Sequence, residues 1–114
     1  MVTARVEALL WLAQRASAAV LALCVAVHLA TIVLAVRGGL SAAEILARTR
    51  GSAAWALFYA LFVLVVAVHA PIGLRAIARE TLGWRGAGLE AATGAAALAL
   101  AWAGWRAVAG LVLA

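Results

Sequence analysis

The sequence contains no aspartate, asparagine or lysine, and it has a single cysteine among 114 residues. Only 11% of its residues are charged, whereas 69% are hydrophobic, against roughly 45–50% apolar residues in soluble domains. One cysteine excludes a disulfide within the chain and a cluster of cysteine metal ligands. A soluble domain of this length could not bury so much apolar surface, so the composition predicts a membrane protein.

The scarcity of charged groups also excludes several kinds of function. The four glutamates, Glu7, Glu44, Glu80 and Glu90, all fall near the ends of apolar runs. No pair of carboxylates, no nucleophile beside a base and no phosphate-binding glycine loop is visible, so we expect no self-contained active site. The net charge of +5 comes from nine arginines, mostly at the ends of these runs. That placement is typical of membrane anchoring and does not indicate nucleic-acid binding.

Three long apolar runs fill most of the chain. Residues 16–36 and 51–74 contain no charged residue, and residues 91–114 contain only Arg106. A helix needs about 20 apolar residues to cross a bilayer, and the runs lack the alternation of barrel strands. We therefore predict an all-α, single transmembrane domain over residues 1–114, with membrane-spanning helices near 8–36, 52–78 and 88–113.

The arginines also predict an orientation. Five lie in the N-terminal segment or near the second loop: Arg5, Arg15, Arg75, Arg79 and Arg85. Three lie around the first loop: Arg37, Arg48 and Arg50. The excess predicts that the N-terminus and the second loop face the cytoplasm. In the first loop, Ser41 and Glu44 have the spacing of a capping box, which predicts a short helix at 41–48.

Two histidines lie deep in the apolar runs. His28 and His69 are titratable side chains within these interiors, and such groups in a membrane indicate function by default. Haem or metal ligation, proton relay, ligand binding and a structural hydrogen bond are all open for them. Neutral imidazole is a good iron ligand, and haem held by histidines in helical bundles is common.

Helical geometry separates the two histidines. Gly73 follows His69 by one turn and leaves room for a flat macrocycle to approach the backbone. Since consecutive helices run antiparallel, His28 and His69 differ in depth by roughly 12 Å. They are poorly placed to bind one haem together. Each needs a second ligand from another chain, or only one of them is a ligand.

A segment of the second helix carries a resemblance to a known family. HAPIGLRAIARE, residues 69–80, resembles the H-x-x-x-G-x-R motif of the cytochrome b membrane-anchor subunits of succinate dehydrogenase and fumarate reductase. His69, Gly73 and Arg75 match the motif, and Glu80 stands for the aspartate that usually follows.

The first helix is similar to the H-R-x-S-G opening of the same family. Arg15 and Ser17 lie in the matching places, whereas Gln14 and Ala18 depart from the usual histidine and glycine. Trp11 stands where many members have a serine that helps to bind quinone. These departures concern the quinone site more than the haem site.

The resemblance implies a haem-b and quinone-binding anchor, with one or two haems for a pair of anchors. His69 would ligate haem, His28 would ligate a second one, and Gly73 and Arg75 would pack against the haem or bind its propionates. Quinone would contact the set Ser17, Arg15 and Trp11. The expected partners are a flavoprotein, an iron–sulfur subunit, and a second anchor subunit or another copy of this chain, in a bacterial-type inner membrane.

Three alternatives stay open from the residues alone. A haem-free scaffold could dock a peripheral dehydrogenase, and a cytochrome b could serve a different dehydrogenase. A small transporter with a histidine relay is disfavoured, because the apolar runs contain no acidic residue or lysine. In the third helix, Thr93, Ala97 and Ala101 form a row of small residues that permits close helix packing. This row favours membership of a larger helical bundle.

Overall fold

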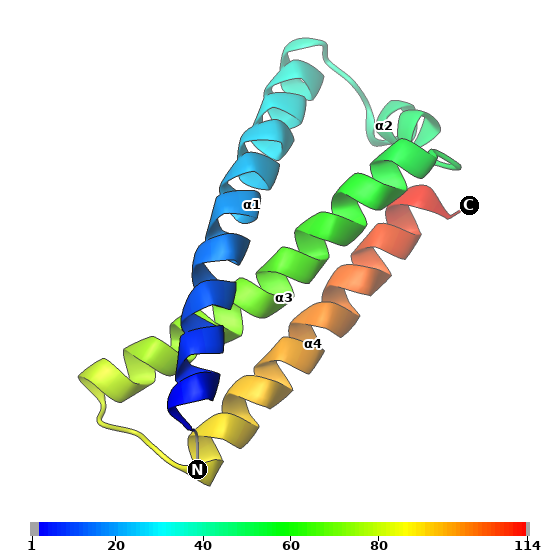
Figure 1. Ribbon diagram of the computed structural model, residues 1–114. Helices are drawn as coiled ribbons and strands as arrows, with labels where there is room; N and C mark the ends of the chain where they lie inside the picture. Colours follow the sequence, from blue (N-terminus) through cyan, green and yellow to red (C-terminus); the bar gives the residue numbers. More distant parts are fainter. Residues whose placement is uncertain (1–2, 114) are drawn as a thin grey trace.

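The computed structural model describes residues 3–113, which form three long helices and one short helix (Figure 1). The long helices are α1 (Ala4–Arg37), α3 (Ala53–Thr81) and α4 (Ala87–Val112), and the short helix is α2 (Ala42–Thr49). Each long helix is apolar enough to cross a membrane. The described part of the chain contains no strand, so the predicted all-α fold with three membrane-spanning helices is confirmed.

Short polar residues begin three of the helices. The hydroxyls of Thr3, Ser41 and Ser52 accept hydrogen bonds from backbone N–H groups at the start of α1, α2 and α3. Such caps satisfy donors that have no partner within the helix. Glu44 completes the capping box with Ser41, which confirms the predicted short helix in the first loop.

The helices α3 and α4 pack along each other, and α1 packs against α3 (Figure 1). A glycine permits the close contact of α3 with α4. A Cβ atom on Gly104 would lie 2.5 Å from Cγ1 of Val63, closer than real Cβ atoms approach. The Arg37 end of α1 stands apart from the other long helices, and residues 38–41 cross from it to α2 (Figure 1).

The hydrophobic core is small, and most large apolar side chains face outward. Buried apolar residues are Cys24, Val65, Leu89, Val108 and Val112. Exposed ones include Leu34, Leu57 and Leu98, each at least 70% accessible. In water such a surface would be unstable, but in a bilayer it contacts lipid or other membrane helices.

The α2 segment is tied to the end of α4. The Thr49 hydroxyl donates to the carbonyl of Leu111 at 2.8 Å, and the N–H of Gly51 donates to the carbonyl of Val112 at 2.8 Å. These carbonyls belong to the last turn of α4, where no partner within the helix remains. Gly51 has φ +71°, a conformation that suits glycine.

Candidate functional site

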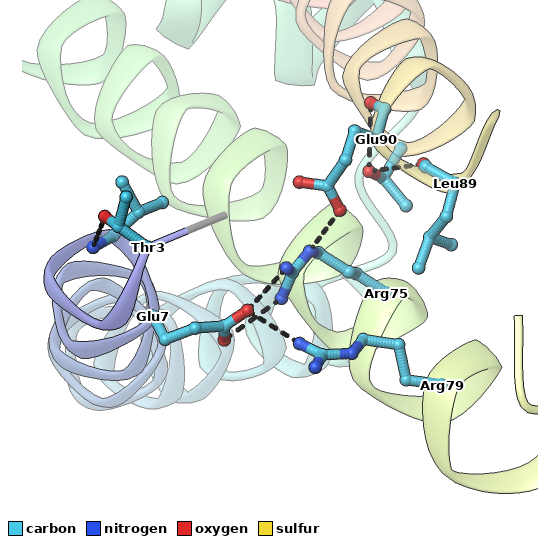
Figure 2. A network of polar contacts seen from close by, with 8 residues as sticks. Thr3, Glu7, Arg75, Arg79, Leu89 and Glu90 are labelled. Carbon is cyan, nitrogen blue, oxygen red and sulfur yellow. Dashed lines mark hydrogen bonds and ion pairs between the residues drawn. The ribbon is translucent and has the colours of Figure 1, made fainter. Parts of the chain in front are cut away.

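Four charged side chains meet where α1 begins, α3 nears its end and α4 begins (Figure 2). Arg75 donates from Nη2 to Oε1 of Glu7 at 2.7 Å, and from Nη1 to Oε2 of Glu7 at 3.4 Å. Its Nε donates to Oε1 of Glu90 at 2.7 Å. Arg79 adds a 2.7 Å hydrogen bond from Nη1 to Glu7. We call this group the charge network.

The charge network compensates a buried guanidinium. Arg75 is 8% exposed, and a buried charge is tolerated only when it is paired and hydrogen-bonded. Glu7 and Glu90 face it from different helices, and Arg's planar fork of donors suits two carboxylates at once. The network therefore fixes the relative positions of α1, α3 and α4 at this end.

A hollow of about 360 Å³ lies beside the charge network. Charged and apolar side chains of α1, α3 and the loop that follows α3 line it together: Glu7, Leu10, Trp11, Gln14, Ile72, Arg75, Ala76, Arg79, Glu80 and Arg85. Of the residues predicted to contact quinone, Trp11 belongs to this lining, whereas Arg15 and Ser17 do not.

Arg15 and Ser17 have other contacts in the structure. The guanidinium of Arg15 lies over the ring of Trp11, with Cζ 5.2 Å from the ring centroid. The hydroxyl of Ser17 is buried and donates to the backbone carbonyl of Gln14 at 3.1 Å. Arg15 therefore supports the side chain that lines the hollow, and Ser17 uses its proton within α1.

One ring nitrogen of His69 is buried without a hydrogen-bond partner in the described part of the chain. Its Nδ1 is buried and has no hydrogen-bond partner among residues 3–113, and the same holds for Oε1 of Gln14. Gly73 lies one turn beyond His69, and a Cβ atom there would lie 3.3 Å from Nε2 of Gln14. The amide of Gln14 thus occupies the space over Gly73.

The Nδ1 atom of His28, in contrast to that of His69, has a hydrogen-bond partner. Its Nδ1 lies 3.1 Å from the hydroxyl of Tyr59, and the rings of Tyr59 and Phe62 meet it edge-on at 5.5 and 5.4 Å. It lines a cavity of about 850 Å³ between α1, α3 and α4, under α2. This volume lies within the range of about 300–1,000 Å³ that is typical of ligand sites.

Comparison with known proteins gives one result. The family model described as succinate dehydrogenase/fumarate reductase transmembrane subunit matches residues 1–112. The chain belongs to this family. No curated protein and no solved structure gives a significant match. Membership of the succinate dehydrogenase/fumarate reductase transmembrane family makes the chain a multi-pass membrane subunit of a larger complex with other subunits.

In this family member the two histidines do not meet. His28 lies level with Tyr59 and Phe62 on α3, which precede His69 by ten and seven residues. At 1.5 Å per residue the separation along α3 is about 10–15 Å, in agreement with the predicted offset of roughly 12 Å. Two axial ligands of one iron must lie on either side of that atom, so these histidines do not form such a pair.

The charge network of this transmembrane subunit was missed from the sequence. The glutamates were predicted near helix ends, but neither Glu7 nor Glu90 was paired with Arg75. A signal existed, because these helix ends were predicted to lie at the same membrane face as Arg75 and Arg79. The sequence carried no such signal for the contact between Tyr59 and His28, because a tyrosine among other aromatic residues is ordinarily a packing residue.

Proposed function

We propose that this chain is a cytochrome b membrane anchor of a succinate:quinone oxidoreductase, either a succinate dehydrogenase or a fumarate reductase. It binds haem b and helps to form the quinone site, so that electrons pass between an iron–sulfur subunit and membrane quinone. The observation that carries the proposal is the buried, unpaired Nδ1 of His69, one turn before Gly73 in a membrane-spanning helix. A polar side chain in a membrane-spanning helix is costly, and ligation of a haem iron by the other ring nitrogen, Nε2, would account for an imidazole here.

His69 would hold the haem through one imidazole nitrogen. Gly73 removes a side chain at the adjacent turn, and the Gln14 amide that lies over Gly73 would border the bound group. When bound, the haem iron would accept and release one electron at a time. Because His28 is displaced along the bundle, the second ligand comes from a partner anchor or from another copy of this chain.

His28 is the proposed ligand of a second haem. Metal-binding histidines generally hold their other ring nitrogen in a hydrogen bond, and the Nδ1 contact with Tyr59 supplies such a bond. Nε2 is then the atom left for iron. The 850 Å³ cavity beside His28 supports this assignment, and the purely structural pairing with Tyr59 is its alternative.

The quinone head group is proposed to bind in the 360 Å³ hollow next to the charge network. Trp11 offers an aromatic face there, and Arg79 and Arg85 offer N–H donors to a carbonyl oxygen. Arg15 and Ser17 support this wall through Trp11 and Gln14. A haem propionate would compete with Glu7 for Arg75, and the 3.4 Å contact is the one most readily replaced.

The proposed orientation places the charge network at the cytoplasmic face of a bacterial inner membrane, where the five arginines of that end favour it. The flavoprotein and iron–sulfur subunits would then dock beside the hollow. A second anchor subunit, or another copy of this chain, would cover the exposed apolar faces. Membrane lipid surrounds the rest.

A dithionite-reduced minus oxidised spectrum of the purified complex, with pyridine haemochrome quantification, tests the proposal. One haem b per anchor chain supports ligation by both histidines, and half a haem per anchor chain supports a single shared haem. Absence of haem b would contradict the proposal and favour a haem-free scaffold that docks a peripheral dehydrogenase. If a donor other than succinate reduces the haem and succinate does not, the chain is a cytochrome b of a different dehydrogenase.

A further inference from the structure

Two buried polar side-chain atoms have no hydrogen-bond partner in the part of the chain that the structure describes. Among residues 3–113, the buried side-chain polar atoms without a hydrogen-bond partner are Oε1 of Gln14 and Nδ1 of His69. Their chemistry is complementary. An amide oxygen only accepts hydrogen bonds, whereas the imidazole Nδ1 donates in one of its two neutral tautomers.

The backbone at Gly73 brings the two side chains to the same turn. On a helix, the side chain of a residue covers the surface of the turn that precedes it. Gly73 has no side chain, so the surface between Gly73 and His69 is open to α1. The Gln14 amide enters this space, since its Nε2 lies 3.3 Å from the position of a Gly73 Cβ.

We propose that Oε1 of Gln14 accepts a hydrogen bond from Nδ1–H of His69 when Nε2 of His69 ligates haem iron. This inference rests on the proposed haem ligation. Gln14 is then a positioning residue, which selects the tautomer of His69 and fixes the plane of its ring. Such outer partners of ligating histidines are usually a carboxylate, a carbonyl or water, and they raise the basicity of the ligand.

Within residues 3–113 the Gln14 amide is unpaired at its oxygen and lies over Gly73, which makes it the acceptor that we assign to His69. The nearby carboxylates Glu7 and Glu90 are bound to Arg75. The Ser17 hydroxyl, one turn along α1, donates to the backbone carbonyl of Gln14 and so helps to hold this turn of α1. Gln14 also lines the hollow beside the charge network, so the same amide forms a wall of the proposed quinone site.

The test compares three variants of the assembled complex: Gln14→Leu, Gln14→Glu and the control Thr81→Ala. The measurements are haem content, the midpoint potential of the haem and its low-temperature EPR spectrum. Gln14→Leu removes the acceptor, so the imidazole becomes a weaker electron donor and the potential rises. Gln14→Glu provides a stronger acceptor, so the imidazole becomes more basic and the potential falls. Thr81→Ala leaves the potential unchanged, because the exposed Thr81 hydroxyl donates only to the Ile77 carbonyl of its own helix.

Opposite shifts of the two Gln14 variants support the inference, because a general disturbance of packing would move both in one direction. Shifts of the same sign, or unchanged potentials and EPR signals, would overturn it. If Gln14→Leu fails to assemble, Gln14→Glu decides alone, since it retains an acceptor oxygen at the same place. Haem-free wild-type complex would refute the proposed function, whereas haem-loaded complex with unchanged potentials would refute only the role of Gln14.

Discussion

Nδ1 of His28 and the hydroxyl of Tyr59 lie 3.1 Å apart and join α1 to α3 within the membrane-spanning region. The ring of Tyr59 also stacks on Trp55, with centroids 5.6 Å apart and an angle of 22°. The hydroxyl is held by this stacking and has little freedom to leave the histidine. His28 is therefore fixed in orientation before any ligand binds.

Replacing Tyr59 with Phe should loosen this contact without removing the ring. The substitution leaves Nδ1 of His28 unpaired, and we expect a loss of about 1–3 kcal/mol of stability. Thermal denaturation of the purified complex measures the loss. Thr31→Val is the matched control, because the Thr31 hydroxyl only donates to the His28 backbone at 2.6 Å. Equal losses for both variants would argue against a special role of Tyr59.

Replacing each histidine with alanine should show which of the two ligates haem. We expect His69→Ala to abolish the haem whose ligand it is, and pyridine haemochrome analysis to show the decrease. His28→Ala should remove a second haem if one is present, and should otherwise leave the haem content unchanged while weakening the α1–α3 contact. Unchanged haem content in His69→Ala complex would exclude His69 as a ligand.

Gly104→Ala should force α3 and α4 apart. Its new Cβ would lie 2.5 Å from Cγ1 of Val63, and overpacking of this kind typically costs about 1–3 kcal/mol. The control is Gly94→Ala on the same helix, where nothing lies within 4 Å of the new Cβ. The double variant Gly104→Ala with Val63→Ala should recover most of the thermal stability. A lack of recovery would show that the loss has another cause.

Glu7→Gln should weaken the charged end, because the carboxylate binds both Arg75 and Arg79. Glu7 is itself partly exposed, at 39% of its side chain, so we expect a modest loss of about 1 kcal/mol. The loss should shrink at high salt, where the wild-type pairs are screened. Glu80→Gln serves as the control, because Glu80 lines the same hollow and has no ion pair among the described residues. A loss that is independent of salt would contradict an electrostatic origin.

The start of α2 should respond to acid. The hydrogen bonds of Ser41 to Glu44 lower the pKa of the Glu44 carboxyl below its ordinary value. Since the folded pKa lies below the unfolded one, the stabilisation is present at neutral pH and is lost as pH falls through the lowered pKa. A ¹³C NMR titration of Glu44 measures the shift. Ser41→Ala keeps the backbone N–H that donates to the Glu44 carboxylate and removes only the hydroxyl, so the pKa should rise part of the way toward its ordinary value. An unchanged pKa would contradict the contribution of the Ser41 hydroxyl.

Much of the fold could be predicted because hydrocarbon imposes simple rules. Uncharged runs of sufficient length gave the three helices, and Ser41 with Glu44 gave the short one. The offset of His28 from His69 followed from helix rise and antiparallel packing. The partners of individual side chains did not follow, since they depend on how far the helices rotate about their axes. Glu7 with Arg75, Tyr59 with His28, and Gln14 over Gly73 all depend on that rotation.

The ion pairs of the charge network form in a fixed order during translation. Glu7 and Glu90 bind the same guanidinium although they lie 83 positions apart in the chain. During translation Arg75 can meet Glu7 as soon as α3 is made, but its second carboxylate arrives only with α4. Insertion of the last helix is therefore the event that completes the charged end.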